Sequence, residues 1–257
     1  MHLGILGNYG ATNIGDEAIL SSILKAHPVH EFTVFSANPF DTEEQHKVKA
    51  VPLFPFGFRS FFKYGFRRSL KALKSVDAVI LGGGGLFQDD RLYACFLWAW
   101  QCFWVYRSKK LLFVYGVGVG PLKTRFGRWL TRYALSKASV ITVRDTESKV
   151  LLQNIGLTQG EIHVTADPAW LLKVPPESGE RKKGLYLISL RPWKDHPPKI
   201  IEIFTEFLLK LKEEKHARFE FISMQSIKEK EDSLLHQLAE RVGGEVIQPD
   251  SFLDLMK

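Results

Sequence analysis

The stretch GILGNYGATNIGDEAIL, residues Gly4 to Leu20, decides the fold class of this protein. Its first residues are apolar and predict a short buried strand, whereas Ala18, Ile19 and Ile23 beyond the turn recur at helical spacing. A strand, a glycine-rich turn and a helix start together predict the first unit of an α/β protein. The amide groups of such a turn, backed by the helix dipole, suit a phosphate, a carboxylate or a sugar hydroxyl.

The glycine spacing in this turn disfavours two common ligands. The dinucleotide fingerprint needs glycines at G-x-G-x-x-G, whereas Gly7, Gly10 and Gly15 lie farther apart and the lysine of a P-loop is absent. We therefore do not expect NAD or ATP. Asp16 has two interpretations here, because an Asp at a helix start either caps free amide groups or faces a ligand.

The composition is that of a globular protein with one large or two ordinary domains, since 45% of its 257 residues are hydrophobic and no repeat recurs at a fixed period. Cys95 and Cys102 lack the spacing of metal ligands, and Met1 leads directly into a strand rather than a signal peptide. These features favour a cytoplasmic protein without a metal or cofactor. The apolar segment Leu92 to Tyr106 is too short to cross a membrane and predicts a buried helix.

Strand-like and helix-like segments alternate along the chain, which is typical of a parallel sheet. After the first strand, further strands are predicted at four places, each ending in a polar or glycine turn: Glu31 to Ala37, Ala78 to Gly85, Lys110 to Pro121 and Ser139 to Asp145. Ligands of parallel sheets gather at the carboxyl ends of the strands. We therefore expect the binding site among these turns.

The chain is predicted to form two domains. A first lobe, residues 1–172, closes near VTADPAWLL, and the proline-rich, charged stretch 173–183 is typical of a linker. Residues 184–257 predict a second lobe with three strands, and a further helix begins at Ser251. This is a small set of elements for an α/β lobe, so the second lobe is expected to be incomplete.

An ordered set of motifs resembles the polysaccharide pyruvyl transferase family, in particular its bacterial branch that modifies cell-wall polymers. The motifs are GNYGATNIGDEAIL, VILGGGGLFQD, GVGVGPL, ITVRDTES, VTADPAWLL and ISLRPW. The resemblance implies two Rossmann-like lobes similar to GT-B glycosyltransferases, with the acceptor on the first lobe and the donor on the second. It also implies that pyruvate passes from phosphoenolpyruvate to a sugar as a ketal. The sequence ends before the family's Arg-Leu-His motif, which leaves the activity of this chain alone open.

The chemistry of that reaction selects candidate residues. Phosphoenolpyruvate carries a phosphate and a carboxylate, so its site needs cations, and transfer onto two hydroxyls needs acid-base groups. The resemblance makes Arg191 the donor-binding arginine; the alternative is an ordinary surface arginine. In the first lobe we expect Asp16 to act as a base and the following residues to bind substrate: Asn13, Gly15, Gly83, Gly84, Asp89 and Arg144. Alternatively, Asp89 and Asp90 cap the helix at 92–106, and Arg144 pairs with Asp145.

The net charge of +7 is partly local, because no acidic residue lies between Glu44 and Asp77. The segment Phe54 to Lys74 mixes basic and aromatic residues, which suits an anionic bilayer surface if the acceptor is lipid-linked. The alternative is an amphipathic helix packed on its own domain, and nucleic acid is not expected. A second basic stripe, Arg125, Arg128 and Arg132, predicts only a solvated helix face. Two other functions stay open: glycosyl transfer from a nucleotide-sugar, and a non-catalytic fragment.

Overall fold

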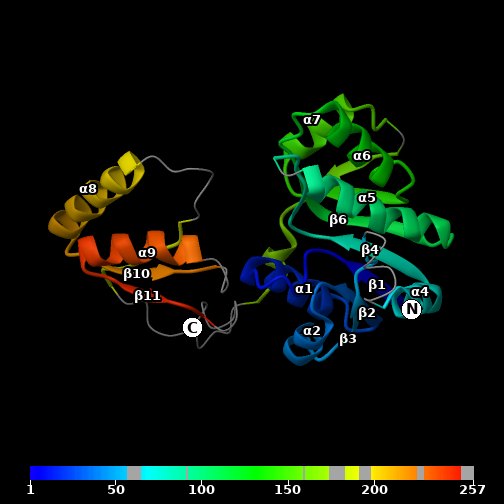
Figure 1. Cartoon of the computed structure of the whole chain (residues 1–257), viewed down its shortest axis with the longest axis horizontal. Helices are drawn as coiled ribbons and strands as arrows, with labels where there is room; N and C mark the ends of the chain where they lie inside the picture. Colours follow the sequence, from blue (N-terminus) through cyan, green and yellow to red (C-terminus); the bar gives the residue numbers. More distant parts are fainter. Residues whose placement is uncertain are drawn as a thin grey trace. The chain divides into compact units, whose positions relative to one another are not determined.

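A computed structural model describes residues 1–56, 65–90, 92–158, 160–173, 183–190, 198–224 and 229–249 of the protein. The chain divides into two compact units, which are described separately (Figure 1). The first consists of Met1–Ala11 with Gly15–Lys173, and the second of Thr12–Ile14 with Val174–Lys257. The predicted linker lies mostly outside the described residues.

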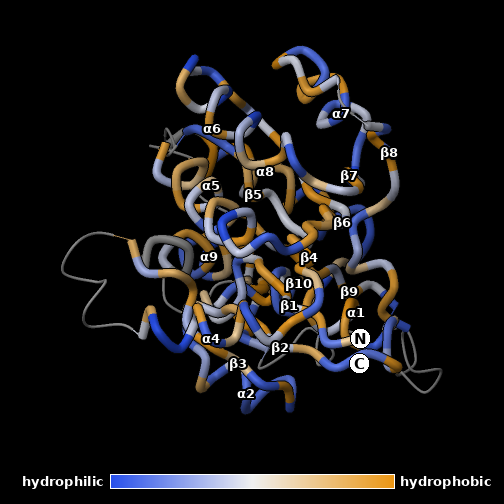
Figure 2. Tube along the Cα trace, turned by 90° about the vertical axis from the view of Figure 1, so that its right-hand side faces the viewer, coloured by the Kyte–Doolittle hydropathy of each residue, from blue (hydrophilic) through white to orange (hydrophobic). Residues whose placement is uncertain are grey.

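The first unit is built on a parallel sheet in the order β3-β2-β1-β4-β6-β7-β8, with the short strand β5 added to β6. Every strand pair in it is parallel. The strands are β1 His2–Leu6, β2 Glu31–Ser36, β3 Lys49–Pro52, β4 Ala78–Gly82, β5 Gly85–Phe87, β6 Leu111–Val119, β7 Val140–Val143 and β8 Ile162–Val164. The strand β4 is orange in Figure 2, the hydrophobic end of the scale, as expected of a strand buried on both faces.

Helices cover both faces of this sheet. The helix α1 (Ile14–Ala26) buries Ile19, Leu20 and Ile23 on one face, against Ile5 and Ile80. The opposite face is covered by α4, α5, α6 and α7, whose buried residues share one core with Leu81 and Val114. The helix bounds are α2 Pro39–His46, α4 Phe66–Ser75, α5 Leu92–Arg107, α6 Arg125–Leu135 and α7 Thr146–Asn154, and a 3₁₀ turn, η1, follows at Pro168–Leu171. The predicted α/β class with parallel strands is therefore confirmed.

The second unit has its own small parallel sheet and core. Its strands are β9 Leu185–Ile188, β10 Arg218–Ile222 and β11 Glu245–Ile247, in the order β11-β10-β9. The helices α8 (Pro198–Lys215) and α9 (Glu229–Val242) pack with β10 around Phe219, Phe221, Leu235 and Leu238. The predicted helix at Ser251 lies outside the described residues.

The basic aromatic segment at 54–74 is neither one helix nor a uniformly exposed surface. Phe54 is 1% exposed and its ring stacks between those of Phe35 and Trp104 at 5.8 and 5.6 Å. Phe66 at the start of α4 packs on both Phe54 and Trp104. The expectation that Phe54 faces a bilayer is therefore wrong, because its ring completes the core under α5. Residues 57–64 lie outside the described part.

Candidate functional site

The glycine-rich turn after β1 is held at the carboxyl edge of the sheet by side-chain hydrogen bonds. Tyr9 donates its hydroxyl to the carbonyl of Gly82 at 2.9 Å, and burial raises the pKa of this phenol well above its ordinary value. The amide of Gly10 donates to a carboxylate oxygen of Glu17 at 2.8 Å, and the other oxygen of Glu17 lies 2.8 Å from Nε2 of His46. The turn is thus fixed before any ligand binds.

Asp16 lies in the first turn of α1 and faces the glycine turn after β4. Its carboxylate accepts a hydrogen bond from Nδ2 of Asn8 at 2.8 Å. A Cβ built on Gly84 would lie 2.8 Å from Oδ1 of Asp16, and Gly84 has a φ of +73° that favours glycine. Gly83, with a φ of +60°, is closed to a side chain by Ile19. The helix α1 therefore packs closely on this glycine turn, with Asp16 against Gly84 and Ile19 against Gly83.

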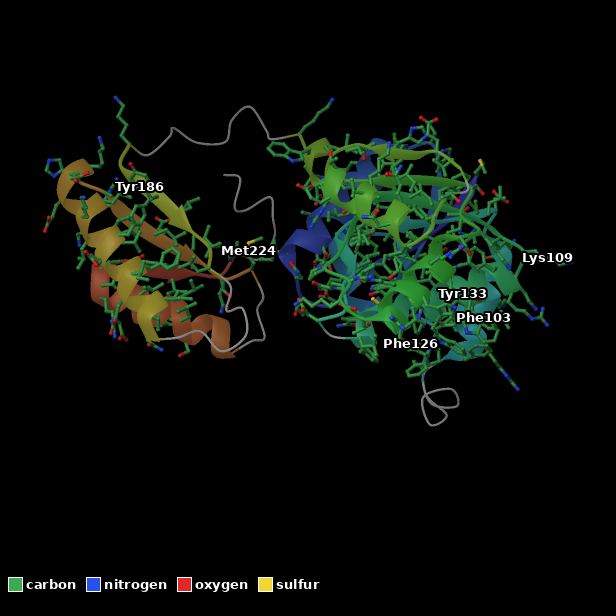
Figure 3. All side chains as sticks on the ribbon, turned by 90° about the horizontal axis from the view of Figure 1, so that it is seen from above. Phe103, Lys109, Phe126, Tyr133, Tyr186 and Met224 are labelled. Atoms are coloured by element: carbon green, nitrogen blue, oxygen red, sulfur yellow. The ribbon has the colours of Figure 1, made fainter. Side chains whose placement is uncertain are left out.

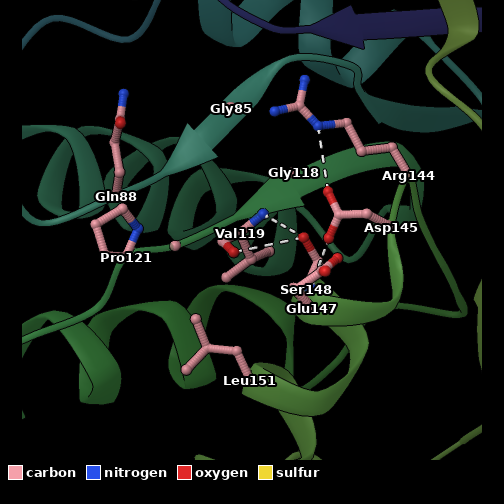
Figure 4. Close-up of a pocket in the computed structure, with 11 residues that line it drawn as sticks. Gly85, Gln88, Gly118, Val119, Pro121, Arg144, Asp145, Glu147, Ser148 and Leu151 are labelled. Atoms are coloured by element: carbon pink, nitrogen blue, oxygen red, sulfur yellow. Dashed lines mark hydrogen bonds and ion pairs between the residues drawn. The ribbon is translucent and has the colours of Figure 1, made fainter.

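A pocket of about 390 Å³ opens on the far side of this glycine turn, within the first unit (Figure 4). That volume falls in the range of small-molecule sites. The pocket is bounded by the ends of β5, β6 and β7 and by the start of α7. Its lining residues are Gly85, Gln88, Gly118, Val119, Gly120, Pro121, Arg144, Asp145, Glu147, Ser148 and Leu151. The predicted position of the site, at the carboxyl ends of strands, matches this pocket.

Arg144 follows directly after β7 and is held by two carboxylates. Its Nη1 donates to Oδ2 of Asp167 at 3.1 Å, and its Nε lies 3.5 Å from Oδ2 of Asp145. A Cβ on Gly118 would lie 2.6 Å from Nε of Arg144, so the guanidinium rests directly on the glycine backbone of β6. The local ion pair between Arg144 and Asp145 is confirmed, and a ligand role of Arg144 stays a prediction.

Asp145 is both a pocket residue and the N-cap of α7. Its side chain accepts a hydrogen bond from the amide of Ser148 at 2.7 Å, and the hydroxyl of Ser148 accepts one from the amide of Val119 at 2.9 Å. Partial burial raises the pKa of Asp145, but the hydrogen bonds from Ser148 and the charge of Arg144 outweigh burial and lower the pKa overall. Asp145 is therefore an anionic hydrogen-bond acceptor near neutral pH.

The charges around the pocket favour a neutral polar ligand over a phosphate. Among the described residues, Arg144 is the cationic side chain that lines the pocket, whereas Asp145 and Glu147 line it with carboxylates and Asp167 holds Arg144 from one side. An added phosphate would meet more negative than positive charge. Sugar hydroxyls can both donate to carboxylates and accept from a guanidinium or from the amide of Gln88.

The carboxylate of Asp89, predicted to bind substrate, is hydrogen-bonded within the protein. It is buried, and its oxygens accept hydrogen bonds from the amide of Lys123 at 2.7 Å, the amide of Thr124, and the hydroxyl of Thr124 at 2.8 Å. Asp89 does not cap α5, because its oxygens are hydrogen-bonded to the turn before α6. The cap by Asp90 and a direct substrate role for Asp89 stay predictions, although this geometry favours a structural role for Asp89.

The remaining predicted residues lie at the edges of the described site. Gly15 is in the first turn of α1, and Asn13 directly precedes that helix among the three residues that group with the second unit. Arg191 lies outside the described residues. Sequence reasoning missed Glu147, Gln88 and the pocket role of Asp145; the spacing of Asp145 and Ser148, typical of a helix cap, was the available signal.

The part of the chain that the structure describes lacks two other features. None of its helices is both long enough and apolar enough to span a membrane. Nor do three or more of its His, Cys, Asp or Glu side chains gather as ligands for a metal ion.

Comparison with known proteins gives one family and one fold. The family model for polysaccharide pyruvyl transferase matches residues 13–254. Among solved structures, the chain resembles Anabaena HepE in complex with UDP and glucose, with a TM-score of 0.60 and 13% identity, over 100% of this chain and 71% of that one. It also resembles a putative UDP-N-acetylglucosamine 2-epimerase from Listeria monocytogenes, with a TM-score of 0.60 and 11% identity, over 99% and 70%. These likenesses confirm the expected GT-B-like fold.

Proposed function

This chain belongs to the polysaccharide pyruvyl transferase family, and from that premise we propose that it transfers pyruvate from phosphoenolpyruvate to a sugar of a cell-wall or exopolysaccharide precursor. The family match over residues 13–254 is the observation that carries the proposal. In this reaction one sugar hydroxyl adds to the enol carbon while the methylene carbon takes a proton. A second hydroxyl of the same sugar then displaces phosphate, which closes the ketal.

The first unit suits the sugar acceptor. The pocket beside Arg144 offers carboxylates, an amide and a guanidinium, which together can bind several hydroxyls of one sugar. Asp145 would hold a hydroxyl rather than remove its proton, because its lowered pKa makes it a weak base. Asp16, on the other side of the turn at Gly84, is the proposed base.

The donor is proposed to bind elsewhere, because the charge of this pocket does not suit an enol phosphate. Arg191 stays the predicted donor-binding residue. Its guanidinium can bind a carboxylate or a phosphate through two parallel hydrogen bonds. If the acceptor is lipid-linked, the reaction takes place at the cytoplasmic face of a membrane.

Glycosyl transfer from a nucleotide-sugar is the second candidate, since Anabaena HepE has the same fold and was captured with UDP and glucose. At 13% identity this likeness concerns the fold alone. Incubating the protein with phosphoenolpyruvate, or separately with UDP-sugars, in the presence of saccharide acceptors separates the two. Phosphate release together with a saccharide that gains a pyruvyl ketal supports our proposal. UDP release without phosphate release contradicts it.

Variants test whether the acceptor and phosphoenolpyruvate bind at separate sites. Arg144→Gln should raise the acceptor KM about 10- to 150-fold, the loss of a charge-assisted contact, while the phosphoenolpyruvate KM stays unchanged. Arg191→Ala should show the opposite split. Asp16→Asn keeps the size of the side chain and an oxygen that can accept from Asn8 but removes the base, so kcat should fall about 100-fold or more. Full activity of Asp16→Asn would leave Asp16 with a structural role only.

A further inference from the structure

The helix α6 carries a row of stacked aromatic rings on its solvent side. Phe126 is 48% exposed and Trp129 is 58% exposed. Their ring centroids lie 5.7 Å apart with planes 13° apart, and Trp129 stacks on Tyr133 at 6.0 Å and 20°. The fully buried residues of α6 are Gly127, Leu130, Thr131, Ala134 and Leu135, and Tyr133 is partly buried against the same core. The exposed rings of Phe126 and Trp129 are therefore not needed to attach the helix to its domain.

The neighbouring helix α5 also carries partly exposed aromatic rings. Phe103 stacks on Trp100 at 5.6 Å with planes 10° apart, and both rings are half-buried. Figure 3 shows Phe103, Phe126 and Tyr133 on the same side of the first unit. We call Phe103, Phe126, Trp129 and Tyr133 the aromatic face. Solvent-exposed rings in such a group usually mark a surface that binds something.

The charge around the aromatic face is entirely positive over a long stretch of chain. Between Asp90 and Asp145 there is no Asp or Glu, whereas ten Lys and Arg fall in that interval. Arg125, Arg128 and Arg132 are exposed along α6 beside the rings, and no carboxylate of the described residues forms an ion pair with them. The first unit holds 21 Lys and Arg against 13 Asp and Glu, and the second holds 14 against 15.

We propose that the aromatic face of α5 and α6, with the arginines of α6, docks the protein on an anionic lipid bilayer. Trp and Tyr rings are favoured at the level of lipid headgroups, where an apolar body and a polar tip are both satisfied. Arginines beside them are attracted to acidic headgroups. The proposal is independent of the pyruvyl transfer reaction, because docking is measured without catalysis.

Two other occupants suit this face less well. A second copy meeting this face through two-fold symmetry would place the same arginines against one another, which is repulsive. Single-stranded nucleic acid would match the charge, but it binds aromatic platforms by stacking bases on open ring faces. Here Phe126, Trp129 and Tyr133 stack on one another, so each ring already shares a face with its neighbour.

Co-sedimentation with vesicles tests the proposal on the whole protein. The protein should bind vesicles that contain about one third phosphatidylglycerol and should not bind pure phosphatidylcholine. Binding should weaken from 0.1 M to 1 M salt, since the Debye length falls from about 10 Å to about 3 Å. Replacing Phe126 and Trp129 together by Ser should reduce the partition coefficient on the order of tenfold.

A matched pair of charge variants locates the contact. Replacing Arg125, Arg128 and Arg132 by Gln removes three charges from α6 and should reduce binding about fivefold for each arginine. Replacing Arg67, Arg68 and Lys71 by Gln removes the same charge from α4 and should reduce binding much less. Each variant must first show the circular dichroism and thermal unfolding of the unmodified protein. An equal or larger loss in the α4 variant would overturn the assignment to α6.

Brominated lipid gives a readout that does not depend on affinity. Bromine on an acyl chain quenches only tryptophan that enters the bilayer, so quenching should fall in Trp129→Phe. It should persist in Trp170→Phe, which removes an 84% exposed ring from η1. Three results would refute the proposal: no binding to anionic vesicles at low salt, a lipid-free dimer that Trp129→Ser dissociates, or binding of an oligonucleotide in place of vesicles.

Discussion

The helices α4 and α6 have similar compositions, but the aromatic residue of α4 faces the core and the first two aromatic residues of α6 face the solvent. Both contain basic and aromatic residues and no acidic ones: FRRSLKALKS in α4 and RFGRWLTRYAL in α6. Yet Phe66 of α4 packs inward on Phe54 and Trp104, whereas Phe126 and Trp129 of α6 face the solvent. A count of aromatic and basic residues thus does not tell a core helix from a docking helix.

The phase of the rings within the helical period makes the difference. Phe66 is in line with Ser69 and Leu73, three and seven residues on, and both of those are buried. Phe126 and Trp129 instead lie one position before the buried residues Gly127 and Leu130. Their side chains therefore point beside the core stripe, where no neighbour covers them. The expectation that Arg125, Arg128 and Arg132 lie on a solvated helix face is confirmed, and the exposed rings of Phe126 and Trp129 lie between them.

The largest effect expected from this contrast is on stability. Replacing Phe54, the ring against which α4 packs, by Ala should lower the free energy of unfolding by about 3–5 kcal/mol, because it leaves a cavity between Phe35 and Trp104. Phe126→Ala on α6 should change it by less than about 0.5 kcal/mol. Denaturant unfolding of both variants measures this difference. Similar losses in the two would mean that the rings of α6 are core residues after all.

A smaller effect is expected at Asp89, which braces α6 and has no counterpart at α4. Asp89→Asn places an NH₂ or a neutral oxygen against the amides of Lys123 and Thr124, and should lower the free energy of unfolding by about 1.5–3 kcal/mol. Burial raises the pKa of Asp89, but these hydrogen bonds and Lys123 outweigh burial, so its pKa is lowered overall.

The lowered pKa of Asp89 gives this prediction a pH dependence. A carboxyl with a lower pKa in the folded state stabilises the protein above its unfolded pKa of about 3.9, and the stabilisation is lost as the pH falls through the folded value. The difference between the unmodified protein and Asp89→Asn should therefore be constant near neutral pH and shrink below about pH 4. A difference that does not shrink in acid would show that the carboxylate charge contributes nothing.

The smallest expected effect is at the N-cap residue, which directly precedes each helix. Thr124 caps α6, with its hydroxyl oxygen accepting from the amide of Gly127 at 2.9 Å, whereas Gly65 before α4 makes no side-chain cap. Thr124→Ala should lower the free energy of unfolding by about 1 kcal/mol, and Thr124→Ser by only a few tenths. Thermal unfolding of the pair tests whether the hydroxyl, rather than the methyl group, holds α6 in place.

What the sequence predicted well depends on neighbours along the chain. The strands of the first unit could be found because each is a short apolar run that ends in a turn, and the pair of Arg144 with Asp145 joins adjacent residues. The role of Asp89 could not be found, because its partners lie 34 and 35 residues away. The contact of Arg144 with Asp167 was missed for the same reason, since 23 residues separate them.

The carboxyl edge of the sheet was predicted as the site, but its chemistry was only partly foreseen. Parallel strands end at one edge, so Asp16, the glycines at 83 and 84, and Arg144 could be expected to lie there. Glu147 gives no such signal, because it sits in the first turn of α7, where an acidic residue is ordinary. Its place in the pocket comes from how α7 packs beside β6, which a local pattern does not contain.

The contact between Gly118 and Arg144 restricts the order in which these two positions can change during evolution. A side chain at 118 collides with Nε of Arg144 while the arginine is present, although the backbone there is one that other residues can adopt. Once Arg144 is replaced by a small residue, the same change at 118 loses its three shortest contacts, all of which are with Arg144. The two substitutions are therefore epistatic, and the double variant should be less damaged than the sum of the single ones. After Arg144 is lost, a larger residue at position 118 can be accepted. That residue would then hinder the return of an arginine at 144.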